Sequence, residues 1–545
     1  MNKKMIKGFA LLISGVVLAT SMVACGDNDN FTRLPDYAVL EKQMDFYGCS
    51  SGSDGTFLID GIEYELGPDM RTVEAYKMYK DTGFNEINMS GTVAMFAPSW
   101  EQCELKRCME NAYEAGIEHI RVQDERLWEI AERGKENAGG LVGKSGVYKT
   151  YEDLKTYIKG CMKDYIKMPG FYGLIMRDEP TYSYTVTIRY IINAVYDAWE
   201  ELVQENDLQG PIKDYIEVYQ CLLPYSNISS RYCGDGQYDN MNDAYRGYLE
   251  GYLRPTIDGV VDENGELVQF KTMSTLTVDV YAPRKNGLSP DYFVSVQALR
   301  EVCAKYNVQP RFVATSFEMY SGMEMSYRGA YKSEMLLEMY SLIGNGYKKV
   351  GYYTYQPSVR ENALSEWNEE FNFITRGGEK TNIYYYGQDV MDIAQKTAKI
   401  TCNYDFLGSK FYFADMPNFD TSSYTTGQTC KFVNTKGESV RDAMRYVNSD
   451  EYKHLEDVRL DNDVVYTTEL HDVTNDLYMY MLQNAMDPAH GKNGRTAVNI
   501  TAIFDNQFTH VAVIEDGNIY YQELVDGVYQ KTLSAGYAVF VVPLK

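Results

Sequence analysis

Histidine is scarce in this sequence, and its scarcity excludes one class of hydrolase. Five of the 545 residues are histidine, and no HExxH motif or other paired spacing occurs among them. Zinc hydrolases bind their metal through such closely spaced side chains. We therefore expect no metal and no other cofactor, and we expect His119 to be a satisfied core residue.

Paired cysteines and excess basic charge are also missing. With Cys25 set aside, nine of the ten cysteines remain, an odd number without CxxC spacing. Neither a disulfide scaffold nor a zinc knuckle is expected, so most of these thiols should be buried hydrophobes. The 52 Lys and Arg residues face 77 Asp and Glu residues, for a net charge of −25. This balance excludes nucleic acid and an anionic membrane surface as partners.

The N-terminus has the pattern of an export signal. A charged start is followed by an apolar run and then by Cys25, which is the layout of a secretory signal peptide. We assign residues 1–24 to the signal and residues 25–40 to a lipidated cysteine with its tether, because Met22-Val-Ala-Cys25 resembles the lipobox of bacterial lipoproteins. The resemblance implies an exported protein, anchored to the bacterial membrane or cell surface only through the lipid on Cys25.

Between residues 41 and 408 the sequence alternates between strand and helix patterns. Strands separated by helices imply right-handed crossovers and a parallel sheet, and units of this number and length predict a (β/α)₈ TIM barrel. An open doubly wound sheet is the alternative, but it requires a glycine-rich phosphate loop after its first strand, and none is present. The predicted strands span residues 44–49, 84–89, 117–124, 171–176, 215–223, 276–281, 310–318 and 349–355.

From residue 409 to residue 545 the helical periodicity fades. Turns such as Asp516-Gly and Asp526-Gly separate short strand patterns, which predicts an antiparallel β-sandwich. These strand patterns span residues 497–503, 510–514, 519–524 and 536–542.

The stretch Gly170–Pro180 is predicted to end at the mouth of the barrel, where catalytic residues are found in this fold. It is apolar from Phe171 to Met176 and then changes to Arg177-Asp178-Glu179. A continuous apolar run is typical of a buried parallel strand, and barrel enzymes carry their catalytic side chains at the C-terminal ends of strands. We therefore place Asp178 and Glu179 at the barrel mouth, with an ordinary solvated loop behind a core strand as the alternative.

Acidic residues accompany other predicted strands as well. Asp124 ends the third strand, Asp279 lies in the sixth and Glu318 ends the seventh. Hydrolysis of a glycosidic bond requires two carboxyl groups, one to protonate the leaving oxygen and one to attack the anomeric carbon. These groups lie about 5–5.5 Å apart when the configuration is retained.

The chain resembles clan A of the glycoside hydrolases, the 4/7 barrels with glutamates on strands four and seven. The segments that carry the resemblance are Gly173-Leu-Ile-Met-Arg-Asp-Glu-Pro180, Val278-Asp-Val-Tyr281 and Gly351-Tyr-Tyr-Thr-Tyr355. They are similar to β-galactosidase-like members near family 42, and the resemblance covers most of residues 40–405.

The resemblance implies roles for individual residues. Glu179 would be the acid/base, Glu318 the nucleophile, and Tyr281 the residue that orients the nucleophile. Clan A usually carries Asn before the strand-four glutamate, whereas this chain has Asp178, which when ionised only accepts hydrogen bonds. The residues expected to contact substrate are Arg177, Asp178, Asp124, Asp279, Tyr281, Tyr353 and Tyr355.

Three other patterns leave alternatives open. Gly48-Cys-Ser-Ser-Gly52 matches the GxSxG nucleophile elbow, but a turn-rich stretch follows it instead of the helix that this motif needs. Asp262–Glu266 predicts a hairpin turn, with a calcium loop as the alternative. Arg177 either contacts substrate or pairs with Asp178 or Glu125.

The sequence thus predicts a retaining glycoside hydrolase that acts on an extracellular glycan or oligosaccharide. The alternative from another class is a non-catalytic glycan-binding lipoprotein, an inactive barrel that captures sugar for glycan-uptake machinery. A third hypothesis, an adhesin or assembly protein built on the sandwich, predicts a blocked barrel mouth.

Overall fold

The computed structural model describes most of the chain. Within the described residues, no helix is both long and apolar enough to cross a membrane. The described residues are 31–37, 44–49, 56–59, 62–65, 67–89, 99–225, 241–262, 264–285, 287–289, 292–321, 324–357, 368–370, 372–375, 377–414, 451–462, 464–489 and 496–545.

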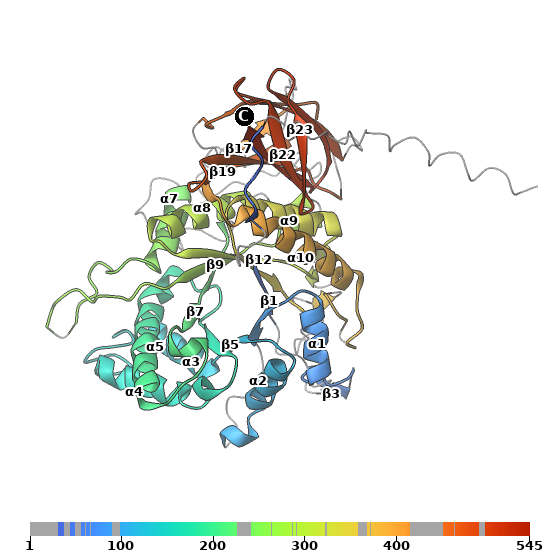
Figure 1. The fold of residues 1–545 in the computed structure, drawn as a ribbon. Coiled ribbons are helices and arrows are strands. Elements are labelled where there is room, and N and C mark those ends of the chain that lie inside the picture. The colour runs from blue at the N-terminus through green and yellow to red at the C-terminus, as the bar shows by residue number, and fades with distance from the viewer. Residues whose placement is uncertain are drawn as a thin grey trace, which may run out of the picture.

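A closed parallel barrel forms the larger part of the molecule (Figure 1). Its strands follow the order β7-β6-β5-β4-β1-β15-β12-β9-β8. β7 and β8 are two halves of one strand that is interrupted at Gln220. The first half pairs with β6 and the second with β9, which closes the barrel. The strands are β1 Asp45–Cys49, β4 Glu86–Met89, β5 His119–Gln123, β6 Phe171–Ile175, β7 Glu217–Tyr219, β8 Cys221–Leu222, β9 Thr275–Asp279, β12 Gln309–Thr315 and β15 Lys349–Tyr353.

Helices connect the barrel strands and cover their outer side. α4 shows how the sequence starts such a helix, because the Thr150 hydroxyl accepts from the Asp153 amide and the Asp153 carboxylate accepts from the Thr150 amide, each at 3.1 Å. This capping box satisfies two amide groups that the first turn leaves unpaired. The helices are α1 Val73–Asp81, α2 Glu104–Glu114, α3 Glu125–Glu136, α4 Tyr151–Met162, α5 Thr185–Glu205, α7 Met241–Gly251, α8 Tyr292–Lys305, α9 Lys332–Gly344 and α10 Asn382–Thr401.

Three small antiparallel sheets decorate the barrel. One of them follows β12 directly, at the C-terminal end of the barrel strands, and has the order β14-β13-β16. The strands of these sheets are β2 Thr56–Ile59 with β3 Ile62–Glu65, β10 Pro283–Arg284 with β11 Gly287–Leu288, and β13 Glu318–Ser321 with β14 Glu324–Tyr327 and β16 Asn368–Glu370.

The base of the barrel interior is a buried ion network. Arg121 on β5 binds the carboxylates of Glu86 and Glu217, which come from β4 and β7. Arg311 also binds Glu217, and Lys349 Nζ lies 3.0 Å from Glu86 Oε1. Buried charges persist only when they are paired in this way. Because this network fills the N-terminal end of the barrel, the opposite end is left for chemistry.

The C-terminal part is an antiparallel β-sandwich. One sheet has the strand order β17-β19-β20-β25-β22-β23, and the other has the order β18-β21-β24. The first of these strands begins at Asp405, just after α10 ends at Thr401. The strands are β17 Asp405–Phe413, β18 Leu455–Leu460, β19 Val464–Asp472, β20 Leu477–Asn484, β21 Ala497–Phe504, β22 His510–Glu515, β23 Asn518–Glu523, β24 Val528–Ser534 and β25 Ala538–Leu544.

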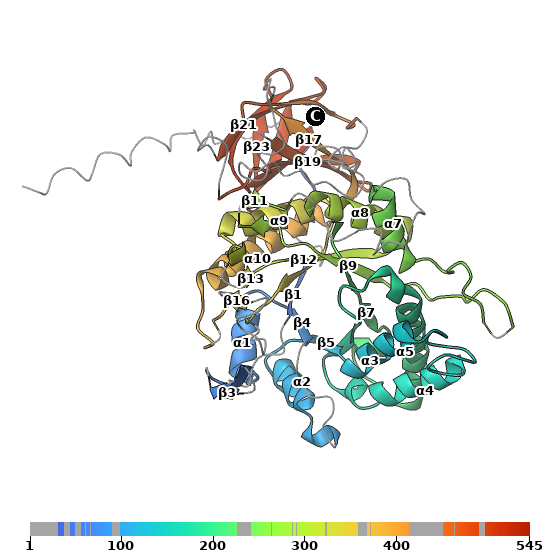
Figure 2. The same cartoon turned by 180° about the vertical axis from the view of Figure 1, so that it is seen from behind.

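The sandwich packs on the outer helices of the barrel. Figures 1 and 2 show it stacked against α8, α9 and α10. The Gln483 amide on β20 donates to the Leu337 carbonyl on α9 at 2.9 Å, and the Asn345 amide donates to the Tyr466 hydroxyl at 2.9 Å. A Cβ on Gly344 would lie 2.5 Å from the Met481 sulfur, so helix and sheet approach very closely.

The segment Phe31–Tyr37, which we call the strap, is docked on this sandwich. The Phe31 ring stacks on His510 at 4.1 Å, and the Thr32 amide donates to the Lys545 carbonyl at 3.0 Å. At the other end of the strap, the Tyr37 hydroxyl donates to Asp472 at 2.7 Å. The strap therefore joins the start of the described chain to its end.

The predicted fold, a TIM barrel followed by a β-sandwich, is confirmed. The hairpin at Asp262 is also confirmed, because the Asp262 amide donates to the Glu266 carbonyl at 2.8 Å. The described cysteines are free, and all but the partly exposed Cys49 are buried. Cys25 and the GxSxG serine, Ser50, lie outside the described residues.

Candidate active site

The end of β6 is held against the split strand β7/β8. The Met176 amide donates to the Tyr219 carbonyl at 2.8 Å, and the Glu179 amide donates to the Cys221 carbonyl at 3.2 Å. Between them, the side-chain amide of Gln220 donates to the Arg177 carbonyl at 2.6 Å. The segment that carries Asp178 and Glu179 is thus fixed although it lies beyond the regular strand.

Glu179 has a backbone conformation that is unusual for its residue type. Its φ is 40°, in the left-handed region. The other described non-glycine residues with positive φ are Asn or Asp, which tolerate this region through local hydrogen bonds, whereas glutamate has no such preference. Residues held in this way concentrate at functional sites. This observation marks Glu179 without reference to any other protein.

The two acidic side chains of this segment share a partly dehydrated setting. Asp178 and Glu179 are both exposed, yet the protein around them removes enough water to raise both pKa values. The pKa of Asp178 is raised to about 7 by burial and by the charge of Glu179, against the opposing charge of Arg177. Burial also raises the pKa of Glu179. A carboxyl group in such a setting can hold a proton near neutral pH, as a general acid must.

A third acidic side chain reaches the same place from β9. The carboxyl group of Asp279 lies close enough to that of Glu179 for each to change the pKa of the other, and the Tyr281 hydroxyl donates to Asp279 Oδ2 at 3.0 Å. Burial and the charges of Glu179 and Asp178 raise the pKa of Asp279 well above its ordinary value. The structure therefore brings together the predicted residues Asp178, Glu179, Asp279 and Tyr281.

Aromatic rings extend this site toward β12 and β15. The Tyr281 ring contacts Phe317 edge-on at 4.8 Å and lies 6.0 Å from Tyr353. Tyr327 closes the group at 5.6 Å from Phe317. Tyrosine rings offer an apolar face with a polar edge. Tyr353, predicted to contact substrate, lies in this group.

Glu318 follows Phe317 directly but does not belong to the barrel strand. β12 ends at Thr315, and Glu318 opens β13, where it pairs with Glu370 of β16. Its side chain is partly exposed and lies beside Gly329, whose added Cβ would be 3.4 Å from Glu318 Oε2. The predicted strand therefore extended three residues too far, and the nucleophile role of Glu318 stays a prediction.

Two residues that were predicted to contact substrate make contacts within the fold. Asp124 is fully buried and caps α3, accepting from the Arg126 amide at 3.0 Å, from the Arg126 guanidinium and from the Tyr165 hydroxyl at 3.0 Å. The Arg177 guanidinium pairs with Glu132 at 2.8 Å, not with Asp178 or Glu125.

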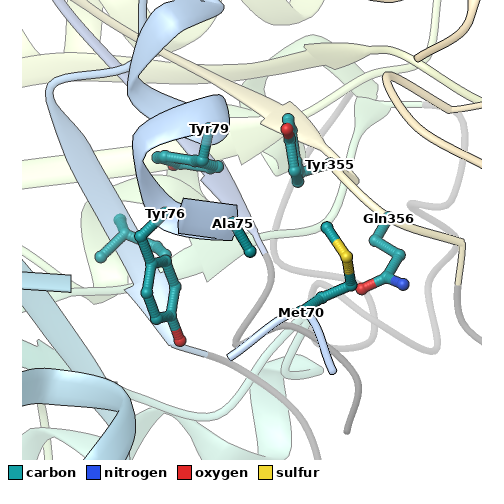
Figure 3. A pocket seen from close by; sticks show the side chains of 7 residues that line it. Met70, Ala75, Tyr76, Tyr79, Tyr355 and Gln356 are labelled. Carbon is teal, nitrogen blue, oxygen red and sulfur yellow. The ribbon is translucent and has the colours of Figure 1, made fainter. Parts of the chain in front are cut away.

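Tyr355, which was predicted to contact substrate, is buried in the structure. It is 4% exposed and packs outside the barrel strands against Tyr79 and Phe373. Figure 3 shows it beside Tyr79, where both side chains line a small cavity next to α1. The space open to the centre of a water molecule is about 10 Å³, which is the room that one water needs. No sugar ring fits there, so Tyr355 belongs to the helix–barrel core.

One residue that sequence analysis missed is Glu338 on α9. It is fully buried, and its carboxylate accepts from the Ala282 amide at 3.2 Å, the Thr315 amide at 3.3 Å and the Thr315 hydroxyl at 3.1 Å. It thereby connects the ends of β9 and β12 behind Tyr281. Burial raises its pKa to about 8. The sequence feature that could have revealed Glu338 is a glutamate in the middle of an otherwise apolar helix face.

Metal binding finds no support among the described side chains. They contain no group of three His, Cys, Asp or Glu residues with geometry for a metal ion. His119 lies at the barrel base, stacked on Tyr172 at 4.3 Å, with Nδ1 3.3 Å from Glu86; its ring is therefore satisfied, although its side chain is 34% exposed and not in the core.

Comparisons with known proteins return glycoside hydrolases at low similarity. No protein-family model and no curated protein sequence matches the chain. A GH27 β-L-arabinopyranosidase from Geobacillus stearothermophilus has a TM-score of 0.45 and 8% identity, over 92% of this chain and 96% of that one. A β-galactosidase from Marinomonas ef1 has a TM-score of 0.38 and 9% identity over 65% of this chain, which spans 60% of that protein. A Bacteroidetes-affiliated GH5 cellulase has a TM-score of 0.38 and 11% identity over 75% and 97%. With TM-scores below 0.5, these likenesses assign no activity to this chain.

Proposed function

We propose that this protein is a retaining glycoside hydrolase whose substrate, an extracellular glycan or oligosaccharide, binds at the barrel mouth. The observation that carries the proposal is Glu179, an exposed glutamate with a raised pKa and a left-handed backbone, fixed at the end of β6 beside Asp178. A folded chain maintains such a conformation only where the surrounding structure determines it. The position is the one where barrel enzymes carry their catalytic groups.

The proposed chemistry uses two carboxyl groups in different roles. Glu179 gives its proton to the glycosidic oxygen while the carboxylate of Glu318 attacks the anomeric carbon. Glu179 then takes a proton from the water that releases the sugar. The ring group of Tyr281, Phe317, Tyr327 and Tyr353 supplies apolar surface for a sugar face between these residues.

The test is hydrolysis of a panel of nitrophenyl glycosides by the protein without its predicted leader. We expect kcat to fall by at least ~10³-fold in Glu318→Gln, and by ~10²–10⁴-fold in Glu179→Gln on substrates with poor leaving groups. Asp389→Asn, on the exposed surface of α10, is the matched control and should keep full activity.

Activity that survives both glutamate substitutions would contradict these roles. If the protein turns over no sugar but binds glycans in calorimetry, the capture protein replaces the enzyme. The partner would then be glycan-uptake machinery.

We further propose that the protein is exported and held at the bacterial membrane or cell surface by a lipid on Cys25. The N-terminal sequence pattern supports this proposal. The net charge of −25 supports contact through the lipid alone, since anionic headgroups repel such a surface.

A further inference from the structure

Arg328 connects the mouth of the barrel to the β-sandwich. It directly follows β14 and is buried, and its guanidinium binds partners from different parts of the fold. Its Nε donates to Glu334 Oε1 at 2.8 Å, and its Nη2 donates to Asp487 Oδ1 at 2.7 Å. Its Nη1 donates to the Arg284 carbonyl. Because the guanidinium is planar and rigid, it fixes these groups relative to one another.

The two carboxylate partners belong to the barrel and to the sandwich. Glu334 lies in the first turn of α9. Asp487 follows β20 and is buried, and its Oδ1 also accepts from the Ala489 amide at 3.0 Å. A Cβ on Gly536, just before β25, would collide with the Ser333 carbonyl, so the sandwich touches the start of α9 directly. Asp487 therefore reaches Arg328 across a closely packed contact.

The residue before Arg328 belongs to the aromatic group at the mouth. The Tyr327 ring lies 5.7 Å from Tyr281 and 5.6 Å from Phe317. The Arg284 guanidinium lies over the same ring, 4.2 Å from its centre, which is a favourable cation–π distance. Arg284 thus holds the ring with its side chain while its carbonyl holds Arg328.

The residue after Arg328 lies against the proposed nucleophile. A Cβ on Gly329 would be 3.4 Å from Glu318 Oε2 and 3.8 Å from the Glu318 Cβ. A displacement of Arg328 would therefore move two parts of the site together, the Tyr327 ring on one side and the neighbour of Glu318 on the other.

We propose that Asp487 is a positioning residue of the active site, through which the sandwich holds the segment Tyr327–Gly329 and thereby the orientation of Glu318. The inference rests on the proposed glycosidase function, in which Glu318 attacks the anomeric carbon. Such an attack is fast only when the two reacting atoms are held in contact and in line, and a small misplacement slows it strongly. The sandwich then contributes to catalysis although none of its groups reacts.

The decisive experiment is the kinetics of Asp487→Ala on nitrophenyl glycosides, measured well below its melting temperature. We expect kcat/KM to fall by ~10- to 100-fold. The loss should be as large on dinitrophenyl glycosides, which need no acid, because the attack by Glu318 is slowed and not the protonation by Glu179. Asp487→Asn keeps an oxygen that accepts from Arg328 and Ala489, so it should recover most of the lost activity.

Tyr340→Phe is the matched control. Tyr340 lies on α9, and its hydroxyl donates to Asp516 of the sandwich at 2.7 Å. The substitution removes one hydrogen bond between helix and sandwich without touching the segment Tyr327–Gly329, and kcat/KM should stay within about two-fold of the wild type. A loss equal to that of Asp487→Ala would reveal a general loosening of the contact and would overturn the proposal.

Arg328→Lys is a second test variant. It keeps a positive charge between Glu334 and Asp487 but loses the planar fork, so it should show the same loss as Asp487→Ala. In Asp487→Ala the charge of Arg328 stays paired with Glu334, and the variant is expected to fold. If it does not fold, Arg328→Lys decides, and full activity in that variant would overturn the proposal.

The link can also be measured without turnover. A fluorotyrosine placed only at position 327 should give a shifted or broadened ¹⁹F resonance in Asp487→Ala and in Arg328→Lys, and an unchanged one in Tyr340→Phe. An unchanged resonance in both test variants would overturn the inference even if no sugar is turned over. An active wild type whose two test variants keep full kcat/KM would overturn it as well and leave the glycosidase intact.

Discussion

At the scale of single residues, Glu179 combines an unfavourable backbone conformation with a carboxyl group that resists ionisation. Both features oppose stability, because a left-handed backbone costs a residue with a Cβ about 1–2 kcal/mol. Their persistence at one position indicates that the surrounding structure determines this conformation.

The effect of the Glu179 backbone conformation on stability can be measured separately from the effect of its charge. Glu179→Gly should be more stable than Glu179→Ala by about 1 kcal/mol, because glycine has no Cβ to oppose a φ of 40°. Lys77, exposed in the middle of α1, is the matched control, and there glycine should be less stable than alanine by about 1 kcal/mol. Urea unfolding of the four variants gives both differences. The same sign at both positions would contradict the left-handed conformation of Glu179.

The site could be predicted in part from single residues. The apolar run before Asp178-Glu179 was enough to place that pair, because charge follows directly where the strand ends. Tyr353 and Tyr355 have the same residue type and parity, so only the end of β15 at Tyr353 separates a residue at the mouth from one in the core. Asp124 lies both at the end of a predicted strand and just before a helix. In the structure its side chain caps that helix.

At the scale of elements, α9 holds the ends of β9 and β12 through one buried carboxyl group. Glu338 is neutral near pH 7, since burial raises its pKa to about 8 from an ordinary value of about 4.3. A raised pKa in the folded state means that stability is fully present below the unfolded value and is lost as pH rises through the folded value.

Glu338→Gln should remove this pH dependence. Between pH 6 and pH 9 the free energy of unfolding should fall by about 3 kcal/mol more in the wild type than in the variant. The measurement is urea unfolding at both pH values. Glu114→Gln, on the exposed side of α2, controls for an ordinary glutamate and should behave as the wild type does. Parallel pH dependence in wild type and Glu338→Gln would show that Glu338 is ionised throughout.

Strands were predictable where the sequence shows either a continuous apolar run or an alternation of apolar and polar residues. The strand at residues 171–176 matches β6 closely, and the strands from residue 497 onward match β21, β22, β23 and β25. β19 and β20 were missed because the second sheet covers one face and α9 the other. Their residues are buried almost throughout, so no alternation of polar and apolar residues remains. The break of the fifth strand at Gln220 also leaves no local signal, because only barrel closure requires it.

At the scale of the whole molecule, the proposed anchor makes a direct prediction about location. In cells that express the full chain, the wild type should fractionate with membranes. Cys25→Ser should appear in the soluble or secreted fraction, because the substitution removes the proposed lipid and the surface is acidic. Unchanged membrane association of Cys25→Ser would contradict lipidation at this residue.

Together with the proposed anchor, the strap limits how the molecule can be oriented at a membrane. Phe31 is fixed on the sandwich, and six residues of chain span at most about 20 Å, so a lipid on Cys25 could not lie farther than that from His510 and Lys545. The sandwich would then be the end that rides close to the bilayer, and the barrel would be carried on its outer side. The sandwich would then act as a spacer that separates the barrel from the lipid surface.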